Sequence, residues 1–309
     1  MSSDLQDMYA VMARIRSFEE RVGRHFRDGD IHGFVHTSIG QEAVAAGACG
    51  SLEQSDAITT THRGHGHCIA KGADPTAMFA ELFGRQTGLC SGRGGSMHIA
   101  DPALGILGAN GIVAAGIPLA VGAAMAARGL DDGRVAVAFF GEGAVHAGAF
   151  HEAVTLAVAW QVPVLFVCEN NGYAEFTRSG SWGGPALTER VGAYGIPADS
   201  IDGGDPAAVR EVVAEWVGTA RSGGGPSFLE ARTVRFGGHF EGDAQDYRSE
   251  GEMDQRERHD PLARARDAVG PESADLMVAE AEREMDEAVA AALRAPYPDA
   301  STVDDFVYG

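Results

Sequence analysis

The sequence predicts an α/β fold, a mostly parallel sheet flanked by helices. Two apolar runs, Val135–Phe140 and Val162–Cys168, enclose the helical pattern of Gly148–Trp160. Continuous apolar runs are typical of strands buried on both faces, and a strand–helix–strand order implies parallel pairing through a right-handed crossover. A weaker unit follows, with a helix at 206–221 and a strand at Phe228–Val234.

Apolar periodicity predicts the remaining helices. Residues 4–28 form an amphipathic pattern, and further helices are expected at 40–51, 74–86, Ile117–Arg128 and 272–294, the last rich in charge. The glycine-rich segment 88–98 is too flexible for a helix, and the polar segment 237–252 is expected to be a mobile loop. Because no domain boundary is visible, residues 1–309 are predicted to form a single domain with an N-terminal helix and a charged C-terminal helix.

Composition limits the classes of function. Hydrophobic residues make up 45% of the chain and charged residues 22%, which is ordinary for a soluble globular protein. The formal net charge of −20 would repel nucleic acid and anionic membrane, so neither is expected as a partner. No apolar stretch approaches the roughly 20 residues that span a bilayer. The N-terminus carries charges throughout and the four cysteines are scattered, so we expect no signal peptide and a cytoplasmic protein with reduced thiols.

Polar residues follow both strands of the central unit. Gly141-Glu142-Gly143 follow the first strand and Asn170-Asn171 the second, and the carboxyl ends of parallel strands meet at one sheet edge. Carboxylate and amide oxygens suit Mg²⁺ or Ca²⁺. Gly143 and Ala144 are expected to open the following helix, where free N–H groups favour phosphate. A metal and a diphosphate are thus one interpretation; a glycine-rich turn and an Asx turn that merely close two loops are an equal alternative.

Longer segments carry a family resemblance. The segments "GQEAVAAGA", "THRGHGHCIAKGADPTAMFAELFGRQTG", "GRGGSMHIAD", "GANGIVAAGIPLAVGAAMA" and "GAFHEAVTLAVAWQVPVLFVCENNGYAEFT" resemble the alpha subunit of the thiamine-dependent decarboxylating component of 2-oxo acid dehydrogenases. The segments "MHIADPALGILGANGIV" and "GHFEGDAQDYR" look most like the acetoin dehydrogenase branch. The resemblance covers nearly the whole chain and implies a thiamine diphosphate-binding fold, with thiamine diphosphate and Mg²⁺ as cofactors.

The resemblance also implies ligands for the metal and the diphosphate. Mg²⁺ would be held by the Glu142 carboxylate, the Asn171 side chain and the backbone carbonyl of Tyr173. The diphosphate would meet the N–H groups of Gly143 and Ala144. It would also meet Arg63, a cation that keeps its charge, with His62 beside it.

Further positions would serve the organic part of the cofactor. Gly111 and Val113 would grip the aminopyrimidine through backbone groups. His36 and His239 would face the reacting end of the thiazolium, where proton transfer needs a group that titrates near neutrality, so both are predicted to be catalytic. Tyr247 and Arg248 would anchor the loop that carries His239.

The implied activity needs a second chain. In this family the glutamate that activates the aminopyrimidine comes from a separate beta subunit, so an α2β2 heterotetramer is expected. The implied reaction cleaves acetoin or a 2-oxo acid such as pyruvate and passes the two-carbon acyl unit to lipoamide on a lipoyl-bearing acyltransferase. One alternative is an acyloin-forming transferase that adds the two-carbon unit to a second carbonyl substrate. Another is a scaffold subunit that has lost cofactor binding.

Three features depart from the family pattern. Glu142 stands where aspartate is usual, and its extra methylene moves the carboxylate about 1.5 Å further out; a role limited to capping the next helix is the alternative. Glu175 occupies a position that is often apolar in relatives. The loop 240–247 contains no serine or threonine, so the phosphorylation control of some relatives is not possible there.

Other histidines have the spacing of a possible metal site. His65 and His67 form an HxH pair, and His98 lies in a second glycine-rich segment. Because neither acidic residues nor cysteines accompany them, we expect active-site lining or structural hydrogen bonds instead.

Overall fold

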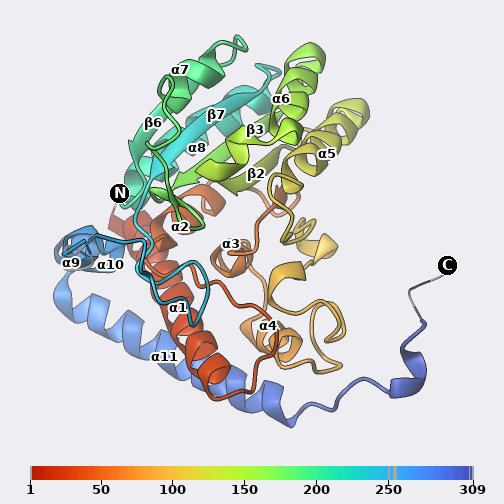
Figure 1. The fold of residues 1–309 in the computed structure, drawn as a ribbon, viewed down its shortest axis with the longest axis vertical. Coiled ribbons are helices and arrows are strands. Elements are labelled where there is room, and N and C mark those ends of the chain that lie inside the picture. Colours follow the sequence, from red (N-terminus) through yellow and green to blue (C-terminus); the bar gives the residue numbers. More distant parts are fainter. Residues whose placement is uncertain (1, 250, 253–255, 306, 308–309) are drawn as a thin grey trace.

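A computed structural model describes residues 2–249, 251–252, 256–305 and 307, and at its centre lies a five-stranded parallel sheet (Figure 1). The strands lie in the order β1 (Ala57–Thr59), β2 (Ala136–Gly141), β3 (Val164–Asn170), β7 (Ser227–Arg232) and β6 (Ala198–Asp202). The pairing of β2 with β3 ends at Gly141 and Glu169, so the next residues of both strands leave the same edge of the sheet. The predicted parallel α/β class is confirmed.

Helices cover both faces of this sheet. Those predicted from periodicity are all present: α1 (Ser2–Arg27), α2 (Glu42–Cys49), α4 (Pro75–Leu82), α5 (Gly116–Leu130), α6 (Gly148–Trp160), α8 (Pro206–Arg221) and α11 (Pro271–Arg294). In Figure 1, α1 and α11 run side by side, and two ion pairs join them, Arg14 with Glu284 and Arg21 with Asp286. Each of these helices is too short or too polar to cross a bilayer, as is every other helix of the described residues.

The sequence did not predict several short elements. They are β1, β6, α3 (His65–Ala70), α7 (Leu187–Gly192), α9 (Arg256–His259), α10 (Pro261–Val269) and an antiparallel hairpin of β4 (Tyr173–Ala174) and β5 (Thr177–Arg178). Elements of two to nine residues are too short for periodicity to separate them from loops. Of the predicted loop 237–252, the parts 237–249 and 251–252 contain neither helix nor strand, as expected, and position 250 lies outside the described residues.

The structure corrects one local prediction. Gly143 and Ala144 do not open the long helix but lie in a separate 3-10 turn, η3 (Glu142–His146). Ala147 then has extended backbone angles, and α6 begins only at Gly148. Two glycines within six residues favour such a break, because glycine loses more conformational freedom than other residues when it enters a helix.

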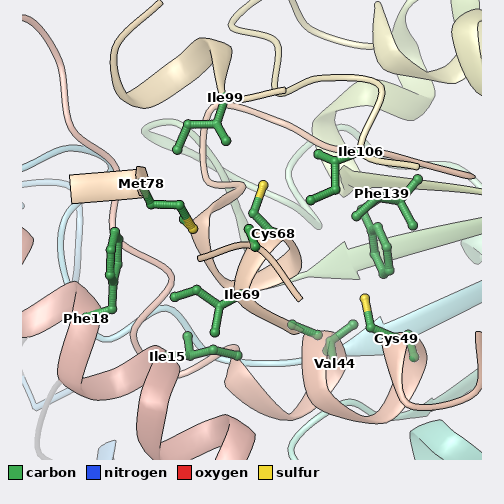
Figure 2. Packing of buried hydrophobic residues seen from close by; sticks show 14 of the residues in the cluster. Ile15, Phe18, Val44, Cys49, Cys68, Ile69, Met78, Ile99, Ile106 and Phe139 are labelled. Carbon is green, nitrogen blue, oxygen red and sulfur yellow. The ribbon is translucent and has the colours of Figure 1, made fainter. Parts of the chain in front are cut away.

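Alternation along the central strands divides the core into two layers. Val137 and Phe139 of β2 point to the layer that contains α1, α2, α3 and α4, which Figure 2 shows around Phe139. Ala138 and Phe140 point to the opposite layer, beneath α5 and α6. Since a strand directs successive side chains to opposite faces, the continuous apolar run of β2 matches burial on both sides. The four cysteines are free, as predicted, and three of them are buried.

Candidate active site

A cavity of about 390 Å³ lies at the carboxyl edge of the sheet, where β2 and β3 end. All the predicted site residues line it: His36, His62, Arg63, Gly111, Val113, Glu142, Gly143, Ala144, Asn171, Tyr173 and His239. They come from segments spread over most of the chain, and the fold brings them to one place. The volume is in the range that small-molecule ligands occupy.

Glu142 provides a buried carboxylate to the lining of the cavity, directly after β2. Its residue exposure is 1%, and Oε1 accepts a hydrogen bond from the Ser179 hydroxyl at 2.6 Å. Burial raises the pKa of the Glu142 carboxyl, while the Ser179 hydrogen bond and nearby backbone groups act in the opposite direction. A carboxylate in this position needs a cation or hydrogen-bond donors to remain charged.

The two adjacent asparagines have different surroundings. Asn171 lines the cavity; its Nδ2 donates to Oε1 of Gln41 at 3.0 Å, and its Oδ1 accepts from the Tyr173 N–H at 3.1 Å. Asn170 instead donates to the Glu230 carboxylate at 2.6 Å and accepts from the Gly172 N–H, closing a turn. Both asparagines thus close an Asx turn with the N–H two residues on, and Asn171 is the one that also borders the cavity.

The hairpin of β4 and β5 forms one wall of the cavity. Ala174 pairs with Thr177, which leaves Glu175 and Phe176 as a two-residue turn. Such turns need positive φ at the first central position, and Glu175 has φ of +52° although it is not glycine. The backbone conformation of Glu175 is thus strained, and the residue stands at the hairpin tip and lines the cavity.

Two buried arginines place positive charge in the cavity, whose lining also contains Glu142, Glu169 and Glu175. Arg63 donates to the carbonyl oxygens of Thr37 and His239, and Arg235 donates to the Tyr247 hydroxyl at 2.7 Å and the Glu175 carbonyl at 3.4 Å. Within the described part of the chain, neither guanidinium forms an ion pair with a carboxylate, and Nε of Arg235 has no partner. Burial, together with repulsion from Arg235, lowers the pKa of Arg63 to about 10. Buried cations without a carboxylate partner are suited to bind an anion.

The rings of three histidines contact one another close to these arginines. The ring of His36 lies 4.6 Å from that of His62 and 4.9 Å from that of His239, measured between centroids. Burial and the Arg63 charge lower the pKa of His36 to about 3 and that of His239 to about 4. Burial also lowers the pKa of His62. The predicted pair therefore titrates below neutrality in this arrangement, not near it, because the sequence could not show the burial or the second arginine.

His65, His67 and His98 make structural hydrogen bonds, as expected. Contrary to expectation, carboxylates do accompany two of them: Glu19 lies beside His65, and Glu169 lies 3.4 Å from Nε2 of His67. His65 is fully buried, with Nδ1 2.8 Å from Glu19 and Nε2 2.9 Å from the Ser96 hydroxyl. His67 Nδ1 lies 2.7 Å from the Thr60 hydroxyl, and His98 Nδ1 lies 3.0 Å from the Gly94 carbonyl oxygen.

One carboxylate organises the glycine-rich segment 88–98. Glu81 of α4 is buried and accepts hydrogen bonds from four backbone N–H groups, those of Cys90, Gly92, Gly94 and Gly95, at 2.7–3.0 Å. This segment carries Met97, whose sulfur lies close to the position that a side chain at Gly111 would take. The flexible sequence is thus ordered by a helix carboxylate, and its Met97 lines the cavity beside Gly111.

The loop that carries His239 is held by several side chains. Arg248 donates to the carbonyl oxygens of Arg235 and Gly237, at 2.9 and 2.7 Å. The Tyr247 hydroxyl donates to Asp243 at 2.7 Å, and Asp243 in turn accepts from the His239 N–H at 2.6 Å. These contacts agree with the anchoring expected of Tyr247 and Arg248.

Sequence reasoning missed three residues with clear roles in this geometry. Arg235 follows the end of β7, so the rule that drew attention to Glu142 and Asn171 could have found it. Gln41 holds Asn171 and Ser179 holds Glu142. Neither has a signal in the sequence, since each contacts a partner far along the chain.

Comparison with known proteins agrees with this geometry. The dehydrogenase E1 component family matches residues 10–302. The chain is 51% identical over 251 residues to the alpha subunit of acetoin:2,6-dichlorophenolindophenol oxidoreductase from Cupriavidus necator, covering 81% of this chain and 75% of that protein. It is 45% identical over 307 residues to the subunit of the same name from Bacillus subtilis, covering 97% and 92%. It is also 41% identical over 305 residues to the pyruvate dehydrogenase E1 component subunit alpha of Zymomonas mobilis, covering 96% and 86%. The chain therefore belongs to the family of dehydrogenase E1 components.

Proposed function

We propose that this chain is the alpha subunit of a thiamine diphosphate-dependent dehydrogenase component. It cleaves acetoin or a 2-oxo acid such as pyruvate and passes the two-carbon acyl unit to lipoamide. The observation that carries the proposal is the charge pattern of one cavity: Arg63 and Arg235 offer buried positive charge beside the oxygen ligands of Glu142 and Asn171. The family and the names of the three relatives support the same activity.

The residues of the cavity fit the two cofactors. Glu142, the Asn171 side chain and the Tyr173 carbonyl would hold Mg²⁺, an oxygen-ligand set that this hard cation prefers. The diphosphate would lie against Arg63, near the free N–H groups of Gly143 and Ala144 in η3, because the first N–H groups of a 3-10 turn have no acceptor within it.

The opposite part of the cavity would take the rings of the cofactor. Gly111 and Val113 would contact the aminopyrimidine through the backbone. His62 would lie next to Arg63, beside the diphosphate. Thiamine diphosphate supplies a nucleophilic carbon and an electron sink when bound. The protein supplies orientation, exclusion of water and proton transfer.

His36 and His239 are the proposed proton-transfer groups. Both imidazoles are neutral at pH 7 because burial and the Arg63 charge lower their pKa values. An anionic diphosphate against Arg63 would offset that charge and raise both pKa values back toward neutrality, where proton transfer is most effective. The Nδ1 of His36 is buried and has no hydrogen-bond partner among the residues that the structure describes, which leaves it available to a bound molecule. His239 is proposed both to contact the cofactor and to move the proton.

Exposed apolar residues beside the cavity support a partner chain. Ile112 is 74% exposed and Val113 is 62% exposed, although both line the cavity. We propose that a separate beta subunit covers them and completes the site in an α2β2 heterotetramer, and that a lipoyl-bearing acyltransferase accepts the product. We further propose that residues 1–309 form one domain and that the assembly is cytoplasmic, in accord with the free cysteines.

The test uses the chain assembled with its beta subunit, thiamine diphosphate and Mg²⁺. Acetoin or pyruvate is offered with an artificial electron acceptor, and dye reduction supports the dehydrogenase. A carbon-linked product that forms only with a second carbonyl compound would support the transferase instead. If calorimetry of the assembled complex detects no cofactor binding, both enzymatic functions are wrong for this chain.

A matched pair of variants tests the charge pattern itself. Arg235→Ala removes a buried cavity cation, whereas Arg232→Ala removes an exposed arginine three residues earlier on the same strand end. We expect the first to weaken thiamine diphosphate binding at least tenfold and the second to leave it unchanged. Equal affinities would contradict the assignment of the diphosphate to this cavity.

A further inference from the structure

The Ser179 hydroxyl is the nearest side-chain partner of the Glu142 carboxylate. Its Oγ donates to Oε1 at 2.6 Å, and within the described residues it is the side-chain hydrogen-bond donor to Glu142. A hydroxyl has one hydrogen to donate, so this bond occupies Oε1 and leaves the lone pairs of the second carboxylate oxygen for another ligand.

Ser179 is itself held by the backbone. Its N–H donates to the Gly172 carbonyl oxygen at 2.9 Å, directly beyond the Tyr173–Arg178 pair of the hairpin. Gly172 has φ of +86°, a conformation that L side chains rarely adopt. The position of the Ser179 backbone is therefore set by the register of β4 and β5, and the hydroxyl is one torsion away from it.

The hairpin also packs directly on the turn that contains Glu142. A side-chain carbon added to Gly143 would lie 2.7 Å from the Cβ of Ala174, closer than real side chains approach. The backbone of η3 therefore approaches the hairpin at a distance that glycine at position 143 allows. Ser179 and Glu142 thus lie on two backbone segments that pack closely against one another.

A fixed hydroxyl has a physical use at this position. Glutamate has one more rotatable bond than aspartate, so its carboxylate has more orientations to lose when it binds a cation. Mg²⁺ demands near-octahedral ligand geometry, and outer partners that orient a metal-bound carboxylate contribute strongly to metal affinity. A hydrogen bond to Oε1 restricts the carboxylate before any metal arrives.

We propose that Ser179 is a positioning residue that orients the Glu142 carboxylate for the divalent cation of the cofactor. This inference rests on the proposed function, since it assumes that Glu142 holds that cation. It gives a reason why a longer acidic side chain can serve at the metal position: the hairpin supplies a hydroxyl 2.6 Å from its carboxylate oxygen.

The experiment measures metal binding directly in the assembled complex with the beta subunit. Mn²⁺ serves as the probe, and its binding is followed by electron paramagnetic resonance in the presence of thiamine diphosphate. Ser179→Ala should weaken Mn²⁺ binding about tenfold, the lower end of the range for outer partners of metal ligands. The control is Ser181→Ala, because Ser181 lies in the same loop but donates to the Arg178 carbonyl oxygen and should leave Mn²⁺ affinity unchanged.

A second pair of variants separates the hydroxyl from side-chain volume. Ser179→Thr and Ser179→Val have nearly the same shape, and threonine alone keeps the donor. The threonine variant should bind Mn²⁺ within about twofold of the original chain, and the valine variant should resemble Ser179→Ala. Equal affinities for these two variants would overturn the proposal, even if Ser179→Ala failed to assemble.

A double-mutant cycle tests the connection to Glu142. In a Glu142→Asp background the shortened carboxylate should lose contact with Ser179, so Ser179→Ala should then change Mn²⁺ affinity less than twofold. The full tenfold loss in both backgrounds would show that Ser179 acts elsewhere, and would overturn the inference. Failure of the proposed function looks different, because the unchanged complex would then bind neither thiamine diphosphate nor Mn²⁺ at this site.

Discussion

Glu19 lies 2.8 Å from His65, joined Oε2 to Nδ1, and both side chains are fully buried. The other carboxylate oxygen accepts from the N–H and the hydroxyl of Ser38, two residues after His36. His65 Nε2 lies 2.9 Å from the Ser96 hydroxyl. This buried pair therefore joins the segment that carries His36 to the glycine-rich segment that supports Gly111.

Removal of this carboxylate should be strongly destabilising. Glu19→Ala leaves three donors without their acceptor in the interior and should lower the free energy of unfolding by about 3–5 kcal/mol, as expected when one partner of a buried pair is deleted. The neighbouring Glu20 is exposed, and Glu20→Ala should change the free energy of unfolding by less than about 0.5 kcal/mol. Urea unfolding of both variants provides the comparison, and a loss below 1 kcal/mol for Glu19→Ala would contradict the interpretation.

The lowered histidine pKa values predict a loss of stability in acid. His36 has a pKa of about 3 and His239 of about 4 in the folded chain, whereas an unfolded histidine has about 6.5. Between about pH 6.5 and pH 3 the unfolded state therefore binds more protons, with the His239 contribution complete near pH 4 and that of His36 near pH 3. The free energy of unfolding should fall as pH falls through this window and level off below it.

A histidine variant tests the source of that slope. His36→Gln should give a shallower dependence of unfolding free energy on pH between 6.5 and 4, while His32→Gln, an exposed histidine nearby, should not. Urea titrations at several pH values measure the slopes. An unchanged slope in His36→Gln would mean that this imidazole is not the group responsible.

Glu175 should influence the choice between charged and neutral substrates. Its negative charge lines the same cavity, and a 2-oxo acid carries a carboxylate that acetoin lacks. Glu175→Gln should raise the pyruvate-to-acetoin ratio of kcat/KM about three- to tenfold, since two like charges a few ångströms apart in a solvated site cost on the order of 1 kcal/mol. Added salt should reduce the difference.

The control for this prediction is Glu189→Gln. Glu189 is an exposed carboxylate on α7 outside the cavity, and its substitution changes net charge by the same amount. Steady-state kinetics with both substrates should show an unchanged ratio. If Glu175→Gln alters both substrates equally, its effect is on the cofactor or the fold and the specificity prediction fails.

Glu81 should decide the order of the glycine-rich segment 88–98. Glu81→Ala removes the acceptor of four backbone N–H groups, and glycines provide no side chains to replace it. Amide hydrogen exchange in 90–95 should become at least tenfold faster, with β3 as the internal reference. Glu81→Gln keeps one acceptor oxygen, so its exchange rate in 90–95 should lie between those of the original chain and of Glu81→Ala. If Glu81→Ala is protected as strongly as the original chain, Glu81 does not order this segment.

The elements that sequence predicted well are those with strong local patterns. The α6 helix has the predicted bounds because its apolar spacing is regular, and β2 and β3 were found because strands covered on both faces are apolar throughout. β1 and the hairpin of β4 and β5 were missed because each is two or three residues long. The position of Gly143 was assigned to a helix because a short 3-10 turn and a helix start look alike in sequence.

The sequence by itself determined the α/β class, the sheet edge where Glu142 and Asn171 meet, and the family to which these motifs belong. It did so because strand order and chain direction place the ends of parallel strands together. Only the tertiary structure decided what surrounds those residues. It brought His36 to His239, placed Arg235 behind them and lowered the histidine pKa values by burial. It also set Ser179 against Glu142. Distances, burial and the field of neighbouring charges depend on segments that are distant in the chain, and they exist only once those segments have packed.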